Sequence, residues 1–210
     1  MVRAHIQASR ALPCDAAAYL GAAREYLRPR PGLVVATGGL QGTGKSTLAR
    51  AQAPEIGAAP GALVLRSDEI RKRLHGAAPE ERLPEAAYAA AANDAVNRML
   101  AEAVQVVAAG GHAVIADATF LDRGQRAAIA DAARAAGVPF LGLWLQSPLA
   151  VLEARVAARR SDASDATIEV LRRAAASDPG PIDWVTLDAR DAGAALGAAR
   201  GAIADLGQGR

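Results

Sequence analysis

Eight consecutive residues in the first quarter of the chain have the types and the spacing that hold phosphate. The pattern G-x-x-x-x-G-K-S/T is matched by Gly39-Leu40-Gln41-Gly42-Thr43-Gly44-Lys45-Ser46. Glycines allow the tight turn that brings successive N–H groups against phosphate oxygens. A lysine at this spacing reaches the β- and γ-phosphates of a nucleotide, and the hydroxyl that follows it is a ligand for Mg²⁺. We therefore predict that residues 39–47, ending at Thr47, bind ATP, with Lys45 also as a catalytic cation and Ser46 as a metal ligand.

The residues on either side of this loop supply the context that the motif needs. An apolar stretch, 33–37, precedes the loop and predicts a buried strand, and a helical stretch follows from Lys45 to the residue before Pro54. A helix that begins at the loop points the positive end of its dipole at the phosphates. The alternative is an ordinary glycine-rich turn, and the strand–loop–helix order favours the phosphate site.

A carboxylate follows a second apolar stretch. Ala113-Val114-Ile115-Ala116 predicts another strand, and Asp117 stands at its end. In an open parallel sheet, ligands gather at the carboxyl ends of the strands. A carboxylate in that place can hold Mg²⁺ directly or through water, which is the role that we predict for Asp117. The alternative is an ordinary aspartate that caps the next helix.

Asp68 and Arg71 follow a third apolar stretch, 62–66. Because they are three residues apart at the start of a predicted helix, their side chains are expected to lie close together. Phosphoryl transfer to a hydroxyl needs a carboxylate that accepts the proton and a cation that fixes the acceptor. We predict Asp68 as the catalytic base and Arg71 as the cation. The alternative is a helix N-cap with a local ion pair.

Three arginines later in the chain are candidates for neutralising a transferring phosphoryl group. Arg155 and Arg159 share a helix face, and Arg160 follows at the helix end. Cations of this kind can close over a phosphate as a lid. We assign Arg155 to the nucleotide and Arg159 and Arg160 to catalysis, with Asp162 and Asp165 as hinge or ion-pair partners of the lid. A solvated basic surface is the alternative.

Arg126 is the last candidate for chemistry. It follows Asp117 closely in the chain, with Arg123 three residues before it. A cation after a strand end can line the pocket of the phosphoryl acceptor, and we predict Arg126 as a catalytic residue on that basis. A solvated basic face is again the alternative.

Apolar stretches alternate with helical patterns along most of the chain. Strands are predicted at 33–37, 62–66, 113–116, 140–145 and 184–187. Helices are predicted at 16–27, 45–53, 69–74, 85–109, 122–136, 148–159, 166–176 and 192–206. Such alternation predicts an α/β fold with a parallel sheet that helices cover on both faces. Residues 1–31 are predicted as a helical appendage and linker, and residues 32–210 as the main domain.

The composition narrows the class of protein. A formal charge of +2 and an aromatic content of 3% argue against a nucleic-acid groove with stacking side chains. Cys14 is the only cysteine, so no intrachain disulfide or cysteine-based zinc site is possible. No apolar run reaches the length of a membrane span, and the N-terminus lacks a signal pattern. We therefore predict a cytoplasmic protein with no membrane partner.

Four sequence blocks together resemble a known group of enzymes. GGLQGTGKSTLAR, LRSDEIRKRL, VIADATF with Arg126 following, and VAARRSDASDA are similar to P-loop kinases of the zeta-toxin and polynucleotide-kinase-like group. The likeness covers about residues 33–190. It is greatest to the P-loop domain at the C-terminal end of bifunctional proteins whose N-terminal half is aminoglycoside-phosphotransferase-like. The chain is thus expected to be either a stand-alone form or part of a longer protein with such an upstream domain.

The resemblance implies an ATP:hydroxyl phosphotransferase that uses Mg²⁺. It implies a three-layer P-loop fold, a five-stranded sheet of order 2-3-1-4-5 and an arginine lid. The D-x-x-R pair that polynucleotide kinases use at the acceptor hydroxyl matches Asp68 and Arg71. The other matches are the phosphate loop at Lys45 and Ser46, the third-strand block at Asp117, Thr119 and Arg126, and the lid at Arg159 or Arg160.

Three functions fit the sequence. The first is a kinase that moves the γ-phosphate of ATP to a hydroxyl of a sugar, a metabolite or an aminoglycoside-like compound. The second is a kinase of nucleic-acid 5′-hydroxyls, which the low charge and few aromatic residues disfavour. The third is a regulatory ATPase that phosphorylates nothing. The sequence after Asp117 offers no clear Glu or Gln to orient a hydrolytic water, and this favours a kinase.

Overall fold

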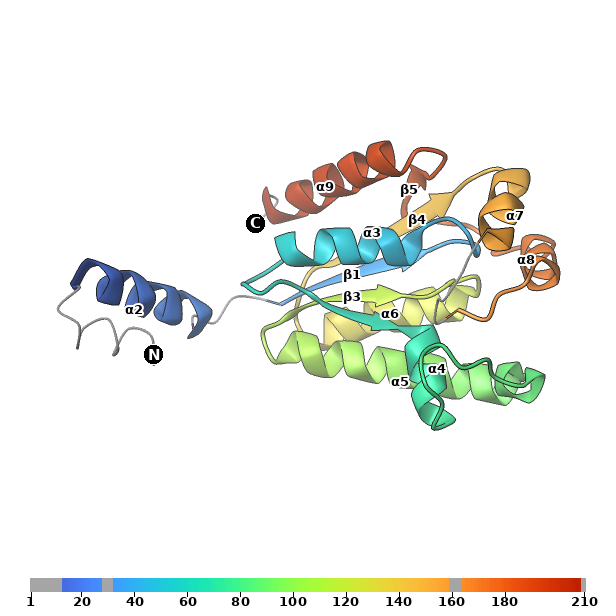
Figure 1. Ribbon diagram of the computed structural model, residues 1–210, viewed down its shortest axis with the longest axis horizontal. Coiled ribbons are helices and arrows are strands. Elements are labelled where there is room, and N and C mark those ends of the chain that lie inside the picture. Colours follow the sequence, from blue (N-terminus) through green and yellow to red (C-terminus); the bar gives the residue numbers. More distant parts are fainter. Residues whose placement is uncertain (1–12, 28–31, 159–163, 209–210) are drawn as a thin grey trace. The chain divides into compact units, whose positions relative to one another are not determined.

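The computed structural model describes residues 13–27, 32–158 and 164–208 (Figure 1). The chain divides into two compact units, Met1–Arg30 and Pro31–Arg210. Helix α2 (Pro13–Leu27) is the described part of the first unit. Within the described residues, no helix is long and apolar enough to cross a membrane.

The second unit is built on one parallel sheet. Its strands are β1 (Leu33–Gly38), β2 (Leu63–Arg66), β3 (Ala113–Asp117), β4 (Phe140–Gln146) and β5 (Val185–Asp188). Every neighbouring pair is parallel, and the order is β2-β3-β1-β4-β5, which confirms the sheet that the resemblance implied. All residues of β3 are buried, as expected for a strand that helices cover on both faces.

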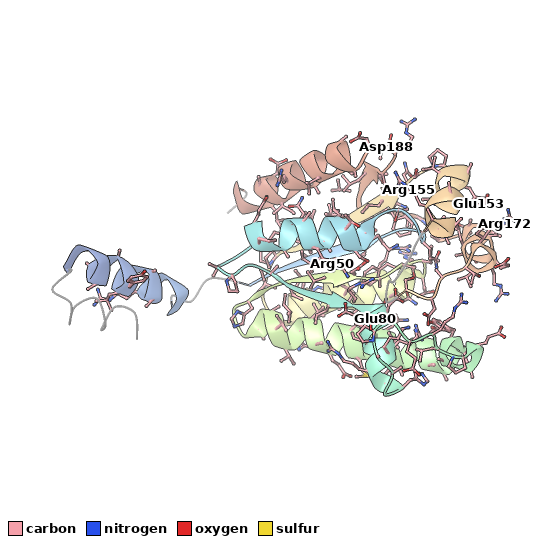
Figure 2. All side chains as sticks on the ribbon, viewed as in Figure 1. Arg50, Glu80, Glu153, Arg155, Arg172 and Asp188 are labelled. Carbon is pink, nitrogen blue, oxygen red and sulfur yellow. The ribbon has the colours of Figure 1, made fainter. Side chains whose placement is uncertain are left out.

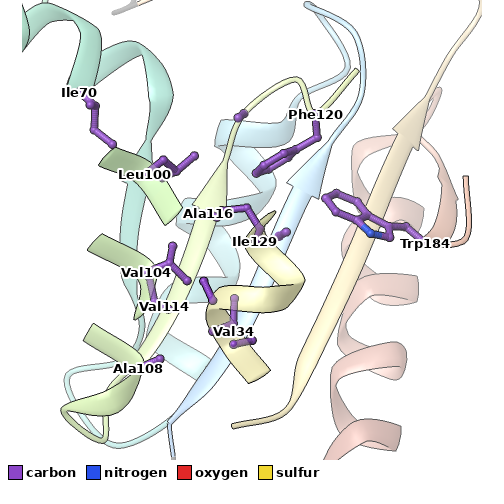
Figure 3. Close-up of a cluster of buried hydrophobic side chains, with 14 of the residues drawn as sticks. Val34, Ile70, Leu100, Val104, Ala108, Val114, Ala116, Phe120, Ile129 and Trp184 are labelled. Atoms are coloured by element: carbon purple, nitrogen blue, oxygen red, sulfur yellow. The ribbon is translucent and has the colours of Figure 1, made fainter. Parts of the chain in front are cut away.

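Four helices cover the two faces of the sheet. On one face lie α3 (Lys45–Gln52) and α9 (Ala192–Gln208), and on the other lie α5 (Ala90–Ala109) and α6 (Arg123–Ala135) (Figure 1). Successive strand residues point to opposite faces, so Val34 packs with α5 and α6 whereas Val35 packs with α3 and α9. Figure 3 shows Leu100, Val104 and Ile129 against the face that α5 and α6 cover.

Three further helices lie beyond the carboxyl ends of the strands. They are α4 (Ser67–Leu74), α7 (Leu149–Ala157) and α8 (Ile168–Ala175). Leu152, Val156 and Leu171 form a small apolar cluster between α7 and α8. Arg172 Nε also donates a hydrogen bond of 2.7 Å to Glu153 across the same pair of helices (Figure 2). These helices enclose the end of the sheet where ligands of parallel sheets bind.

One predicted helix is divided in the structure. The stretch 85–109 was expected to be continuous, but a short 3₁₀-helix, η2 (Glu85–Tyr88), precedes α5, and Ala89 between them has an extended ψ of 156°. The break lets the Ala87 carbonyl accept a hydrogen bond from Arg71 and the Tyr88 hydroxyl reach Asp165. The hydrogen bonds that Ala87 and Tyr88 make to Arg71 and Asp165 therefore stabilise the break more than a continuous helix would.

Candidate functional site

A cavity of about 1250 Å³ lies at the carboxyl end of the sheet. Its walls come from the phosphate loop after β1, the β2–α4 junction, the end of β3, segment 79–88, and the chain from residue 164 to 177. The fold thereby brings together three stretches that the sequence singled out, at residues 39–47, 68–71 and 117–119.

Glycines give the phosphate loop its shape. Gly39 has a φ of 128°, and a Cβ there would lie 2.2 Å from the Leu145 carbonyl oxygen. Gly42 has a φ of 86°, and its Cβ would lie 2.9 Å from the Leu152 carbonyl oxygen. Any larger residue would therefore push the loop off β4 or α7.

Hydrogen bonds within the loop hold it in place. The Gly39 N–H donates to the Thr119 carbonyl at 3.0 Å, which ties the loop to the end of β3. Both Thr43 Oγ1 and Lys45 Nζ donate to the Leu40 carbonyl at 2.8 Å. No side chain caps the first turn of α3, so the N–H groups of that turn are placed to receive an anion.

Asp117 is held by an arginine that the sequence analysis did not single out. Arg66 Nε donates to Asp117 Oδ2 at 3.3 Å, and each side chain is only 4% exposed. Arg66 also donates to Glu69 at 3.4 Å. Arg66 and Asp117 are register partners at the ends of β2 and β3. The sequence held a signal for this pair. Arg66 and Asp117 stand at the ends of two predicted strands, and these strands are neighbours in the sheet.

Asp68 lies in the same cavity in an environment that disfavours its charge. Burial raises the pKa of the Asp68 carboxyl, and the nearby charge of Asp117 raises it further. The cations Arg66, Lys45 and Arg71 act in the opposite direction without cancelling the rise. A carboxyl with a raised pKa binds a proton more tightly than an ordinary aspartate, which suits a proton acceptor.

Arg71 lines the cavity with its guanidinium anchored on one side. Arg71 Nη1 donates to the Ala87 carbonyl at 2.7 Å, and the guanidinium lies over the Tyr88 ring at 4.7 Å from the centroid. Arg71 Nε is buried and has no hydrogen-bond partner among the described residues. Burial lowers the pKa of Arg71, and Tyr88 and Asp68 oppose this effect. The structure thus brings Asp68 and Arg71 to one cavity, as the sequence predicted.

The family is shown by comparison with known proteins. The AAA_33 family model, described as an AAA domain, matches residues 34–179. The chain belongs to this family. A further relative is an uncharacterised protein of Mycobacterium tuberculosis, 32% identical over 176 residues, which are 82% of this chain and 34% of that protein. The chain therefore spans about a third of the length of that relative.

Two kinases are also similar to this AAA domain. An adenylyl-sulfate kinase of Myxococcus xanthus is 32% identical over 127 residues, 59% of this chain and 63% of that protein. The solved structure of the Mycobacterium tuberculosis APS kinase CysC with AMPPNP and APS has a TM-score of 0.59 and 22% identity, covering 85% of this chain and 98% of that chain. The fold of this AAA domain is therefore that of P-loop kinases.

The residues of the AAA domain fit a magnesium ion. Ser46 and Asp117 both line the cavity, and Mg²⁺ is usually held by one or two carboxylates with substrate phosphates and water rather than by a protein cage. Among the described residues there is accordingly no cluster of three or more His, Cys, Asp or Glu side chains for a metal. The assignment of Ser46 and Asp117 to Mg²⁺ stays a prediction.

Arg155 supports the phosphate loop by a hydrogen bond to its backbone. Its Nη1 donates to the carbonyls of Ala189, at 2.8 Å, and Gly42, at 3.4 Å, and its Nη2 donates to Arg190 at 2.9 Å (Figure 2). Arg155 does not line the cavity. It connects α7 and the loop after β5 to the phosphate loop, so its predicted part in nucleotide binding would act through the backbone of Gly42.

Arg126, which the sequence analysis predicted as a catalytic residue, does not line the cavity. Its side chain is 3% exposed and is absent from the cavity walls. The guanidinium donates four hydrogen bonds, of 2.7 to 3.1 Å, to the backbone carbonyls of Phe120, Leu121, Pro179 and Pro181. Because the helix turns Arg126 inward, it joins the loop after β3 to the turn before β5 instead of meeting an acceptor.

The two catalytic arginines of the predicted lid, Arg159 and Arg160, lie outside the described residues, as does Asp162. Asp165 is described, and its partners are Lys72 and Tyr88, neither of which the sequence analysis paired with it. Its role as a hinge or partner of the lid stays a prediction.

Replacing Arg126 by Met should lower the free energy of unfolding by about 2–4 kcal/mol, because four backbone carbonyls lose a charged donor. Urea titration measures this loss. The affinity of the folded protein for ATP, measured by calorimetry, should not change. Arg134→Met on the same helix, where Arg134 is 77% exposed, is the matched control. If Arg126→Met left the stability unchanged but abolished ATP binding, Arg126 would have to act in the functional site.

Replacing Asp68 by Asn should stabilise the protein relative to the wild type as pH rises. The pKa of Asp68 in the folded protein is raised above its usual value, so ionisation of this carboxyl costs stability as pH rises from its unfolded pKa through its folded pKa. The difference in melting temperature between Asp68→Asn and the wild type should therefore grow as pH rises above about 4. Asp131→Asn, at a side chain 58% exposed, is the control. A difference that shrinks over this range would contradict the raised pKa.

Proposed function

We propose that this AAA domain is an ATP-dependent kinase that transfers the γ-phosphate to a hydroxyl of a small molecule. One observation carries the proposal: Asp68, a carboxylate with a raised pKa, lines the same cavity as the phosphate loop and the cation Arg71. A phosphate site alone binds nucleotides, whereas a proton acceptor and a cation beside it also serve an acceptor hydroxyl.

The proposed reaction assigns each group a task. The loop N–H groups, the first turn of α3 and Lys45 bind the β- and γ-phosphates. The acceptor oxygen attacks the γ-phosphorus while the bond from that phosphorus to the bridging oxygen breaks, so that ADP leaves. Asp68 accepts the hydroxyl proton, and Arg71 orients the acceptor. When bound, Mg²⁺ neutralises charge on the phosphates, and Ser46 and Asp117 would hold it.

Small molecules fit the cavity better than nucleic acid. Tyr88 is the only aromatic residue among its described walls, and the walls mix acidic with basic side chains. A groove for single-stranded nucleic acid uses several stacking rings and a predominantly basic surface. Kinases of nucleic-acid 5′-hydroxyls are therefore the second candidate within the same chemistry, and a regulatory ATPase is the candidate of another class.

Finer assignments stay predictions. They include membership of the zeta-toxin and polynucleotide-kinase-like group, a lid formed by Arg159 and Arg160, and a cytoplasmic location. The matched residues make up only 34% of the mycobacterial relative, so that protein contains further sequence outside the match. We propose that this further sequence includes an upstream phosphotransferase-like domain, as the sequence resemblance implied.

Replacing Lys45 by Ala should abolish phosphoryl transfer and weaken ATP binding by at least about tenfold, because a charged hydrogen bond to the phosphates is lost. Calorimetry with ATP and Mg²⁺ measures the affinity. Arg134→Met, on the outside of α6, is a control that also removes one positive charge. Equal ATP affinity in the Lys45 variant and the wild type would contradict the proposal that Lys45 and the phosphate loop bind the phosphates of ATP.

Replacing Asp68 by Asn should leave ATP affinity within about twofold and lower transfer by about a hundredfold or more, because the proton acceptor is lost. The assay follows γ-³²P from ATP with Mg²⁺ into pooled sugars, nucleosides, aminoglycosides, adenosine 5′-phosphosulfate and 5′-hydroxyl oligonucleotides. Asp131→Asn is the control. Labelled product that is lost in the Asp68 variant alone supports the kinase and names the acceptor class. Free phosphate alone, at a rate that Asp68→Asn does not change, would favour the regulatory ATPase.

A further inference from the structure

Three donors from one region of the chain converge on the carboxylate of Asp165. Tyr88 Oη donates to Asp165 Oδ2 at 2.6 Å, the Leu83 N–H donates to the same oxygen at 3.0 Å, and Lys72 Nζ donates to Oδ1 at 3.0 Å. The donors lie 77 to 93 residues from Asp165 in sequence. Asp165 therefore joins the chain just before α8 to segment 79–88 and α4.

This cluster is buried and well satisfied. Lys72 is 2% exposed and Asp165 10%, and Lys72 also donates to the Glu81 carbonyl. Burial by itself would raise the pKa of Asp165, but the hydrogen bonds from Tyr88, Leu83 and Lys72 outweigh it and hold the pKa below its usual range. The structure thus keeps a charged carboxylate in place, where an isolated one would be costly.

The cluster also determines where Arg71 lies. The Tyr88 ring, held by its hydroxyl to Asp165, supports the Arg71 guanidinium at 4.7 Å, and the neighbouring Ala87 carbonyl accepts from Arg71 Nη1. Among the hydrogen bonds of the described residues, none joins Asp165 to Arg71. The charge of Asp165 acts on Arg71 directly and raises its pKa, but the contacts that hold the guanidinium in place run through Tyr88 and the backbone beside it.

We propose that Asp165 is a positioning residue that acts through Tyr88 to hold Arg71 beside Asp68 in the acceptor half of the cavity. The inference rests on the proposed kinase function. It goes beyond that function because it makes the acceptor site depend on a residue in the chain just before α8, outside the predicted D-x-x-R pair. A buried ion pair that only stabilises the fold is the competing explanation.

Two variants separate these explanations. Asp165→Asn removes the charge that holds Tyr88 and Lys72, and Tyr88→Phe removes only the hydroxyl and keeps the ring near Arg71. Each should raise the KM of the acceptor found in the pooled assay by about fivefold to tenfold while the ATP affinity stays within about twofold. The double variant should be no worse than the worse single variant, because both act on one path. Asp131→Asn and Tyr19→Phe are the matched controls.

A second readout needs no enzymatic activity. Labelling of individual arginines by phenylglyoxal, followed by mass spectrometry, reports how accessible Arg71 is. Asp165→Asn should speed labelling of Arg71 by about fivefold or more relative to Arg126, a buried arginine outside the cavity and therefore an internal reference.

The outcomes are distinct. Faster labelling of Arg71 with a raised acceptor KM and unchanged ATP affinity supports the proposal. Labelling of Arg71 that matches the wild type overturns it, whether or not an acceptor is found. An unchanged acceptor KM in folded variants also overturns it, and leaves a purely stabilising ion pair. If no compound in the pool is phosphorylated, the kinase function fails while the labelling result still decides whether Asp165 positions Arg71.

Discussion

Charges buried together at the carboxyl end of the sheet are the constraint on which the site depends. Lys45, Arg66, Asp68 and Asp117 all line one cavity, and both Arg66 and Asp117 are almost fully buried. Removing either charge of the Arg66–Asp117 pair leaves its partner buried and unpaired, at a cost of about 3–5 kcal/mol. The parallel sheet makes the cluster possible because adjacent strands end at the same edge, so residues far apart in sequence become register partners.

The two halves of the cavity are built from different parts of the chain. Backbone groups make the phosphate side, where the conformation of Gly39 and Gly42 and the first turn of α3 determine the shape. Long side chains make the other side, where Arg71, Tyr88 and Asp165 rest on one another. Backbone geometry tolerates little variation in sequence, whereas side-chain contacts can change with a few substitutions. Domains that share this phosphate loop can therefore differ in what they accept on the other side.

Local patterns were enough to predict the strands, their parallel arrangement and part of the site, whereas the order of the strands came from the family resemblance. Apolar stretches marked the strands, glycine spacing marked the phosphate loop, and the strand ends placed Asp68 and Asp117 at one edge. Those patterns could not predict which side chains from distant parts of the sequence contact each other. The Arg66–Asp117 pair, the inward direction of Arg126 and the Lys72–Asp165 pair each depend on side-chain contacts between separate elements. The break at Ala89 has the same origin, because the preceding turn is shaped by Arg71 and Asp165 rather than by helix propensity.

The same pairs explain why two of the arginines cannot exchange roles. Arg71 has one anchored nitrogen, a ring beneath its plane and a buried Nε without a partner among the described residues. A guanidinium in this state still has hydrogen-bonding capacity that an acceptor can satisfy. Arg126 instead donates four hydrogen bonds to backbone carbonyls, so few of its N–H groups remain for a ligand. An arginine near a strand end is therefore not available to a ligand merely because of its position. What matters is how many of its N–H groups already donate to other parts of the protein.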